Sequence, residues 1–535
     1  MRKWGALAVL AAAQFLMVLD QAVMNVSISQ LVEDFDTDVT KIQGAITFYA
    51  LVMAALMITG GKLGDRWGRR RAFAVGHIIY GLGSALTAVA WSVPVLIAGW
   101  SVLEGIGAAL VLPALVALVA GSYHGRDRAL AYGVIGGVAG AGIAVGPILG
   151  GWVTTNATWR YVFVGEVVLA VAIVASIGMI TEAAREGPRP DIDWVGSALS
   201  AAGLGVGVWG ILQASQWGWL EPRNSPIEPL GFALTPFVIG GGVLLLFVFR
   251  WWQERRERLG REPLVRFSLF DNHRLTGGLL MFLAQNIILM GVFFALPLYL
   301  QIVLGLDALD TGVRMLPISV AMFITSSLGA RLTTMWSPRR IIRIGLTVLV
   351  VATLVLLGTL EPVLRGLEFT VAMALLGIGM GLLAAVLGNL VQSSVSSEER
   401  SQAGGLQYTA AQLGSAIGTA FIGAVVIGGL VTGFQDTVAG DPRISDEVRG
   451  AISISLTGDV SFLAADQVRA AAEMASLPAE ETEAIVSAYE SAQLRALKAG
   501  VLAAVLVALA ALVATGRLPA RTLMEMETEE SARAP

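Results

Sequence analysis

The feature that most constrains this chain is a series of apolar runs, each about 20 residues long, which recurs along most of its 535 residues. The mean hydropathy is +0.72 and only 14% of the residues are charged, against about 25% in soluble proteins. A helix that crosses a bilayer needs about 20 mostly apolar residues. The chain is therefore predicted to be an all-α polytopic membrane protein.

Fourteen apolar runs are long enough to span the hydrocarbon layer. They lie at residues 6–28, 42–60, 73–91, 95–118, 129–151, 161–180, 194–212, 230–250, 275–303, 311–330, 341–360, 366–390, 406–431 and 496–515.

The positions of the basic residues indicate the orientation of these spans. Most of the 36 Lys and Arg residues fall in every second connection, including RWWQERRERLGR at 250–261. By the positive-inside rule these connections face the cytoplasm. With an even number of spans, both termini are then predicted to be cytoplasmic, in the cell membrane.

The start of the chain has a second interpretation. Arg2 and Lys3 followed by an apolar run with Ala11-Ala12-Ala13 resemble a cleavable signal peptide. The apolar character continues past residue 28, as expected of a full membrane span.

Several kinds of chemistry find no support in the residues. The chain has no Cys and three scattered His, so no metal cluster is expected. The sequence also has no recognisable pair of a nucleophile and its base, so an enzyme is not expected. No P-loop occurs, so neither ATP nor another cofactor is expected. GVGVWG at 205–210 matches a dinucleotide-binding pattern but lies inside an apolar span. The basic clusters lie between spans, which argues against nucleic acid as a partner.

Two glycine-rich motifs stand out from the apolar background. GGKLGDRWGRRR at 60–71 joins spans 2 and 3; its notable residues are Gly61, Gly64, Asp65, Arg66, Gly68, Arg69, Arg70 and Arg71. Span 5 reads GVIGGVAGAGIAVGPILGG at 133–151, with Gly142, Gly146, Pro147, Gly150 and Gly151. Small residues four apart allow close helix packing. Ordinary packing and positive-inside charge explain part of both motifs.

The first motif closely resembles the loop 2-3 signature of the major facilitator superfamily, and the second resembles the antiporter motif of its exporters. With LDQAVMNVSI in span 1, Trp159-Arg160, and PLYLQIVLG in span 9, the chain is similar to the fourteen-span drug/proton antiporters of that superfamily. The resemblance implies a six-helix bundle in residues 1–185, an inserted two-helix segment with a basic loop in 186–274, and a second six-helix bundle in 275–535. The last part includes an external loop, 432–495, and a cytoplasmic tail, 516–535.

The chain departs from that family at two places. In span 4, where the family has R-x-x-Q-G-x-G, Ser101 stands for the Arg and Glu104 for the Gln. After Trp159-Arg160 the family tends to have Asn, and this chain has Glu166. Both departures introduce acids.

Three acids therefore lie within the outer halves of the first six spans: Asp20, Glu104 and Glu166. An ionised side chain in hydrocarbon is costly, so an intramembrane acid suggests function. Carboxyl groups buried together can bind and release protons near neutral pH. Asp20 and Glu104 are the preferred coupling sites, because spans 1 and 4 line the cavity in the family. Glu166 is the third coupling candidate and ranks below them, because span 6 is peripheral in the family; its alternative role is an ion pair with Arg160 near the outer surface.

Other polar residues are expected to face a cavity between the bundles or to form hydrogen bonds between helices. They are Gln14, Gln21, Asn25, Ser101, Gln285, Asn286 and Asn389. Asp310 and Arg314 form a candidate ion pair, and Arg314 is alternatively a side chain that extends to the membrane surface.

The 432–495 segment holds 11 Asp and Glu against 4 Arg. DQVRAAAEMASL and AEETEAIVSAYESAQL within it are typical of amphipathic helices. The segment is either a solvated helical hairpin or an electrostatic funnel for cationic ligands.

These observations together predict a proton-coupled exporter, acting as a monomer, of lipophilic and cationic small molecules. The alternatives are export of a particular lipid, peptide or metabolite without proton antiport, and a membrane scaffold or sensor whose external segment binds a partner.

Overall fold

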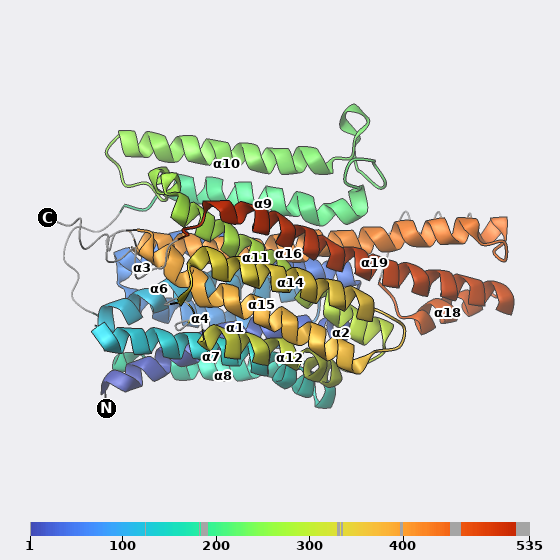
Figure 1. The fold of residues 1–535 in the computed structure, drawn as a ribbon, viewed down its shortest axis with the longest axis horizontal. Helices are drawn as coiled ribbons and strands as arrows, with labels where there is room; N and C mark the ends of the chain where they lie inside the picture. Colours follow the sequence, from blue (N-terminus) through green and yellow to red (C-terminus); the bar gives the residue numbers. More distant parts are fainter. Residues whose placement is uncertain are drawn as a thin grey trace.

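The regular structure of the chain is helical wherever it is described. The computed structural model describes residues 2–520 apart from 124, 181, 183–190, 329–331, 333–334, 396–399 and 450–461. Most of the helices run along one common axis, and both chain ends lie at the same end of the bundle (Figure 1). We call this end the terminal end, and the opposite one, beyond which α16 and α19 project, the extension end.

Twelve helical segments of the described residues are long and apolar enough to cross a bilayer. They are Trp4–Val26, Val39–Trp67, Val93–Val119, Arg160–Met179, Trp194–Trp217, Thr235–Arg258, His273–Val303, Ala308–Ser327, Pro338–Thr359, Gly366–Ser393, Gln402–Gly440 and Ala479–Ala514.

Two further helices occupy positions where spans were expected. They are α4 (Arg69–Ala88), which begins with three arginines that lower its apolar character, and α7 (Gly125–Asn156). α4 packs against α6 (Gly105–Ser122) and α8 (Arg160–Ala175), and α7 packs against α1 (Arg2–Val26). The count of fourteen spans stays a prediction.

The two expected bundles meet along two helix pairs. α7 packs against α12 (Ala308–Ser327), and α3 (Val39–Trp67) packs against α16 (Arg400–Gly440). The remaining helices of the second bundle are α11 (His273–Pro297), α14 (Pro338–Thr359), α15 (Gly366–Ser393) and α19 (Ala479–Ala514). The main contacts between the halves therefore involve the second and the fifth expected spans of each bundle.

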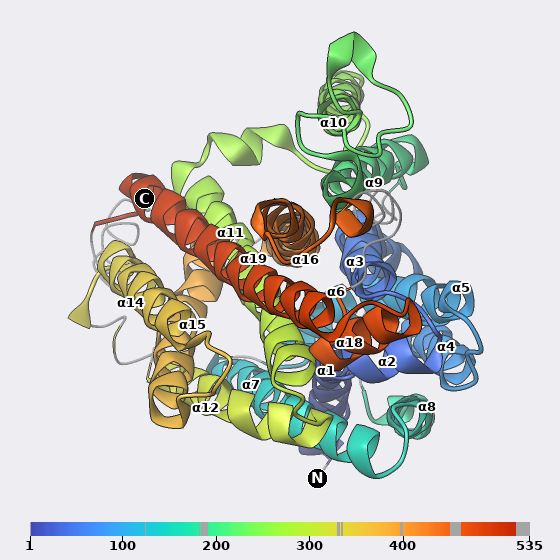
Figure 2. The same ribbon diagram turned by 90° about the vertical axis from the view of Figure 1, so that its right-hand side faces the viewer.

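A helix pair lies outside the bundles. α9 (Trp194–Trp217) packs against α3 and α16, whereas α10 (Thr235–Arg258) lies beyond α9, at the edge of the molecule (Figure 2). Only 17% of the most apolar stretch of α10 is buried inside the protein, whereas 67% of the corresponding stretch of α3 is buried. Such exposure of apolar side chains is expected where a helix faces lipid.

A buried polar cluster holds this pair to the loop that follows it. Asp193 precedes α9 and accepts hydrogen bonds from Gly196 N at 2.9 Å, Trp252 Nε1 at 3.0 Å and Gln253 Nε2 at 2.7 Å. Arg256 Nε lies 3.6 Å from the same carboxylate. Gln253 Oε1 in turn accepts from Leu264 N at 2.6 Å, so the loop after α10 is fastened to both helices.

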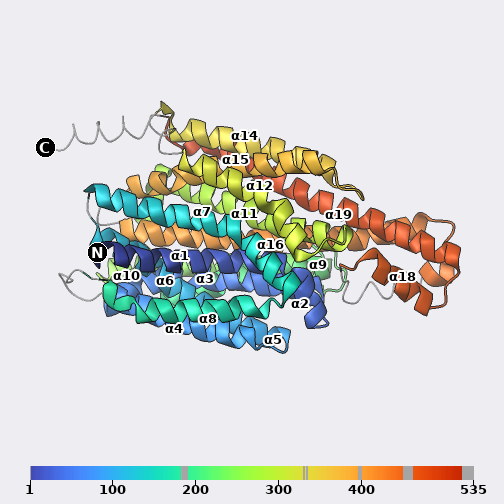
Figure 3. The same ribbon diagram turned by 90° about the horizontal axis from the view of Figure 1, so that it is seen from below.

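The acidic segment is largely a continuation of two spans. α16 runs on to Gly440 and α19 begins at Ala479, so both project well beyond the 432 and 495 limits of the expected loop. α18 (Ala465–Met474) lies at the far end from both termini (Figure 3). Both amphipathic sequences are therefore helical, as expected.

The projecting part continues the main buried apolar cluster of the bundle and has its own ion pairs. Phe434 and Tyr489 pack edge to face, 5.3 Å apart. Arg443 donates hydrogen bonds to Asp441 and holds the pKa of that carboxyl at about 2. This ion pair therefore stays charged at neutral pH.

Candidate functional site: a buried carboxylate triad

The three intramembrane acids converge. Asp20 on α1, Glu104 at the end of η1 (Ile97–Glu104) and Glu166 on α8 each offer a carboxylate oxygen, and these three oxygens lie within 4.8 Å of one another. None of the three side chains is more than 2% exposed. We call Asp20, Glu104 and Glu166 the triad; it lies wholly within the first half of the chain.

Asp20 is held by two aromatic residues. Trp100 on η1 donates its indole N–H to Asp20 Oδ1 at 2.8 Å. The Trp100 ring stacks on Tyr49 of α3, with centroids 4.7 Å apart and planes 4° apart. α1, α3 and η1 are therefore joined around one carboxylate.

The other two acids accept hydrogen bonds from hydroxyl groups of α4. Tyr80 and Ser84 donate to Glu166 Oε2 at 3.2 and 3.3 Å, and Thr87 donates to Glu104 Oε1 at 3.3 Å. These three residues share one face of α4, since their spacing is that of a helix stripe.

Two glycines permit the approach of α4 to η1. A Cβ at Gly83 would lie 2.6 Å from Glu104 Cγ, and a Cβ at Gly99 would lie 2.6 Å from Thr87 Oγ1. Both distances are shorter than van der Waals contact, so a larger residue at either position would push the helices apart. η1 is a π-helix, a widened turn that occurs frequently at functional sites.

The triad lacks positive partners among the described residues. None of the salt bridges there includes a triad carboxylate, and Asp20 Oδ2, Glu104 Oε2 and Glu166 Oε1 have no hydrogen-bond partner. Two charges 4.8 Å apart repel by about 3 to 4 kcal/mol at an effective dielectric constant near 20. The group is stable only when protons or another cation neutralise part of its charge.

The chemistry of the triad also suits a hard cation. Ca²⁺ takes carboxylate oxygens at about 2.3 to 2.6 Å, and three oxygens this close could share such an ion. The expectation that the chain has no metal site stays a prediction.

Glu166 lies with the two preferred candidates, and the alternative prediction that it pairs with Arg160 is wrong. Arg160 instead pairs with Asp34 at 2.5 Å, stacks on Trp159 at 4.4 Å, and donates to Ala90 O at 3.0 Å. Glu166 follows Arg160 by six residues, about 9 Å along the helix and on a different face. Its side chain therefore points into the bundle while Arg160 stays at the surface.

The expected cavity residues have different surroundings. Gln14 is buried with its Oε1 unpartnered, Gln21 is half-buried, and Asn25 donates to Gln21 O at 2.7 Å. Ser101 is fully buried and donates to Ala45 O at 2.8 Å, so it fastens η1 to α3. The role of all four as cavity residues stays a prediction.

In the second half, Gln285 donates to Met380 O at 3.2 Å and Asn286 to Phe282 O at 2.9 Å. Asn389 is exposed. Asp310 and Arg314 are both exposed, and no ion pair joins them among the described residues. Arg314 Nη1 lies instead beside Gly366, so an Asp310–Arg314 pair in another conformation stays a prediction.

The loop 2-3 motif lies at the terminal end and joins several helices there. Gly68 has φ +99°, a conformation that favours glycine, and turns the chain from α3 into α4. Arg69 donates to Asp65 at 3.4 Å and to Ala117 O of α6 at 3.2 Å. Glu182, after α8, accepts from the backbone N–H groups of Arg69 and Arg70 at 2.6 and 3.1 Å.

The span 5 glycines bring α7 close to both halves. A Cβ at Gly142 or Gly150 would lie 3.0 or 2.9 Å from a valine methyl of α1. At Gly151 it would overlap the carbonyl oxygen of Ala308, and at Gly312 that of Pro147, so α7 and α12 are in backbone contact. The motif thus brings the backbones of the two halves into contact near the extension end.

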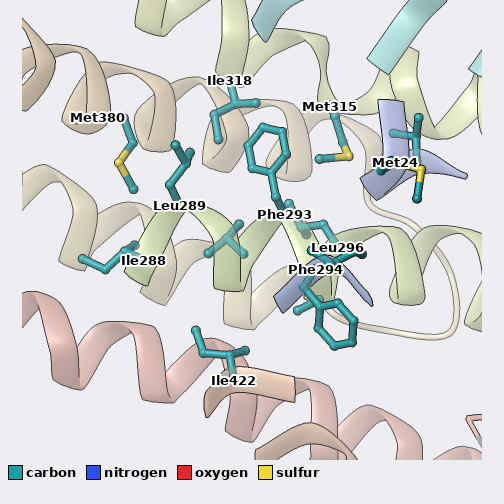
Figure 4. Packing of buried hydrophobic residues seen from close by; sticks show 14 of the residues in the cluster. Met24, Ile288, Leu289, Phe293, Phe294, Leu296, Met315, Ile318, Met380 and Ile422 are labelled. Carbon is teal, nitrogen blue, oxygen red and sulfur yellow. The ribbon is translucent and has the colours of Figure 1, made fainter. Parts of the chain in front are cut away.

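Apolar side chains also pack between the two halves. Met24 of α1, Phe293, Phe294 and Leu296 of α11, and Met315 of α12 belong to one buried cluster (Figure 4). Hydrogen bonds also cross between the halves, among them Gln301 Nε2 to Val26 O at 2.8 Å, Gln43 Nε2 to Thr419 O at 2.8 Å and Leu309 N to Thr155 Oγ1 at 3.2 Å.

The residues that surround the triad were not predicted from the sequence. Tyr49, Tyr80, Ser84, Thr87 and Trp100 looked like ordinary span residues, because their partners come from other helices. One signal was present: His77, Tyr80, Ser84 and Thr87 are spaced 3, 4 and 3 apart, as one polar stripe on a helix.

Comparison with known proteins agrees with this architecture. The chain is 30% identical over 451 residues to the "Probable actinorhodin transporter" of Streptomyces coelicolor, covering 83% of this chain and 75% of the relative. It is 31% identical to a puromycin resistance protein of Streptomyces alboniger (80% and 82% covered) and 28% identical to the multidrug efflux pump LfrA of Mycolicibacterium smegmatis (96% and 95% covered).

A solved structure shares the fold. A bacterial homologue of the human lysosomal transporter Spinster, in an inward-facing, unoccupied conformation, superposes with a TM-score of 0.61 at 16% identity, covering 97% of this chain and 98% of that chain. The family model described as "Major Facilitator Superfamily" matches residues 10–419. Its members are transporters rather than enzymes, and the relatives and the candidate spans together make this a multi-pass protein of the cell membrane. The chain belongs to the Major Facilitator Superfamily.

Proposed function

We propose that this protein is a proton-coupled exporter that expels lipophilic, preferentially cationic, drug-like compounds across the cytoplasmic membrane. The names of the relatives, which include antibiotic resistance and multidrug efflux proteins, support drug export. The observation that carries proton coupling is the triad: three carboxylates within 4.8 Å, enclosed in the first half, with no cationic partner among the described residues.

The triad supplies the chemistry that coupling needs. With the orientation predicted by the positive-inside rule, the terminal end is cytoplasmic and the extension end is external. Protons that enter from outside neutralise the carboxylates, and their loss to the cytoplasm restores negative charge. Restored charge attracts a cationic substrate from inside, while neutralisation weakens that attraction and favours release outside.

Structural coupling follows from the position of Asp20. α1 carries this acid, contacts the span 5 glycines of α7, and contributes to the buried apolar cluster between the halves. A change in the charge around Asp20 therefore acts on a helix that also contacts the second half. Such a helix is where a proton site and a substrate pathway can influence each other.

The test uses purified protein in proteoliposomes that report internal pH. Addition of a lipophilic cation is expected to drive proton movement through the wild type, and an Asp20→Asn, Glu104→Gln double variant is expected to lose it. Glu228→Gln, which removes an exposed acid from the connection between α9 and α10, is the control. Undiminished coupled transport by the double variant, with normal folding, would refute the role of the triad.

Comparing substrate movement with pH change distinguishes proton antiport from the alternative, export without proton antiport. Substrate movement that is fast but produces no pH change, in wild type and variant alike, would favour an exporter without proton antiport. Transport of a neutral compound matched in size to the cation tests the preference for positive charge.

A further inference from the structure

One face of α4 carries buried polar side chains from His77 to Thr87. The buried residues of this helix include His77, Tyr80, Ser84 and Thr87, spaced 3, 4 and 3 apart. Residues at this spacing lie above one another on a helix, with Cβ atoms about 5 to 6 Å apart between neighbours. We call these four residues the polar stripe; it covers about 15 Å of the helix axis.

Three members of the polar stripe already have a partner in the triad. Tyr80 and Ser84 donate to Glu166 at 3.2 and 3.3 Å, and Thr87 donates to Glu104 at 3.3 Å. Nothing in the proposed coupling scheme so far uses the fourth member, His77.

His77 has the features of a proton-transfer group. Its side chain is fully buried, and its Nδ1 lies 2.9 Å from the Phe73 carbonyl oxygen. Its Nε2 is buried with no hydrogen-bond partner. An unsatisfied buried polar atom costs about 1 to 3 kcal/mol, and a polar ring within a membrane span is costly in itself. An apolar residue would fill this site at lower cost unless the free nitrogen has a use.

The position of His77 is also appropriate. α4 starts at the terminal end with Arg69, so His77 lies between that end and the level of the triad, about 12 Å along the helix from Arg69. The elements packed against α4 bring their titratable groups to its two ends. Glu104, Glu166 and Tyr49 lie at the triad, whereas Lys62, Asp65 and Arg66 lie on the last turns of α3.

We infer that the polar stripe is the route by which protons leave the triad toward the terminal end, with His77 as the relay residue. This inference rests on the proposed proton coupling. With the Nδ1–H donating to Phe73 O, the Nε2 lone pair is free to accept a proton.

The transfer balances without another reactant. A carboxylic acid of the triad gives its proton to the Tyr80 hydroxyl oxygen as that hydroxyl passes its own proton, through water, to His77 Nε2. The imidazolium then releases a proton to water at the terminal end. Tyr80 and His77 both end in the state in which they began.

Two transport assays on the same proteoliposomes test the relay. The first measures net proton-coupled efflux; the second measures exchange of labelled for unlabelled substrate at equal pH, which needs no net proton transfer. His77→Phe and His77→Gln are expected to slow net efflux about 100-fold or more, the typical effect of losing a proton-transfer group. Exchange is expected to stay unchanged.

Every other outcome overturns the relay. Equal losses in both assays would assign His77 a structural role, and unchanged net efflux would show that protons take another route. His273→Gln, an exposed histidine at the start of α11, is the matched control and should leave both rates unaltered. Wild-type transport without proton movement would instead contradict the proposed function itself.

Discussion

At the scale of residues, Glu166 illustrates how much the neighbours of a side chain decide. Its position six residues after Arg160 suggested a surface ion pair. In the structure Arg160 pairs with Asp34, and Glu166 turns inward to Tyr80, Ser84 and the other two acids. The residue ranked last among the three acids thus has the same burial as the other two.

Two substitutions distinguish these roles. Glu166→Gln is expected to reduce drug-driven proton movement about as strongly as Asp20→Asn, because each removes one of three carboxylates that share protons. Arg160→Gln breaks a partly exposed ion pair worth about 0 to 1 kcal/mol and should leave proton movement unchanged. Proteoliposome pH recordings measure proton movement in both variants. A larger effect from Arg160→Gln than from Glu166→Gln would contradict the coupling role of Glu166.

At the scale of elements, the helices meet through a few specific contacts. Gly83 and Gly99 let α4 and η1 approach, while Gly151 and Gly312 do the same for α7 and α12. The α9–α10 pair has a different attachment, a polar cluster around Asp193 at the terminal end. The cluster fixes the loop after α10, where Glu262 also contacts Lys62 of the loop 2-3 motif at 3.3 Å.

Asp193 is expected to determine the stability of this attachment. Asp193→Ala leaves Arg256, which is 7% exposed, without its buried partner and removes three further hydrogen bonds. Loss of one partner of a buried charge pair costs about 3 to 5 kcal/mol. The thermal midpoint of the purified protein, followed by tryptophan fluorescence, should fall clearly.

Asp191→Ala is the matched control for this measurement. Asp191 also contacts Arg256, at 3.1 Å, but its side chain is 65% exposed, so the loss should be about 1 kcal/mol or less. Equal shifts for the two variants would contradict a special role for Asp193.

At the scale of the whole molecule, the ends of the bundle differ in charge and in shape. The terminal end carries both chain ends and the arginine-rich loop 2-3, whereas the acidic extension of α16, α18 and α19 projects from the opposite end (Figure 1). By the positive-inside rule, we predict that the terminal end faces the cytoplasm.

The absence of cysteine from the chain makes this orientation simple to test. In intact cells, a membrane-impermeant maleimide is expected to label Glu473→Cys, in α18 of the extension, but not Arg258→Cys, at the end of α10. Permeabilised cells should label both and so serve as the control. The reverse pattern in intact cells would invert the topology.

The sequence by itself determined the membrane class, the helical architecture and the family. Each of these depends on local information: the length of apolar runs, the spacing of glycines in two motifs, and the distribution of arginines between spans. It also pointed to Asp20, Glu104 and Glu166, because an acid in hydrocarbon is unusual wherever it packs. The amphipathic helices of the acidic segment were predicted for the same reason, since their periodicity is local.

Only the tertiary structure decided which of these residues meet. The triad is assembled from α1, η1 and α8, and its hydrogen-bond donors come from α4 and η1, residues that are up to 146 positions apart in the chain. Ser101, expected at a cavity, instead joins η1 to α3. Periodicity gives the face of a helix but not the neighbour on that face, because side-chain contacts depend on how helices cross.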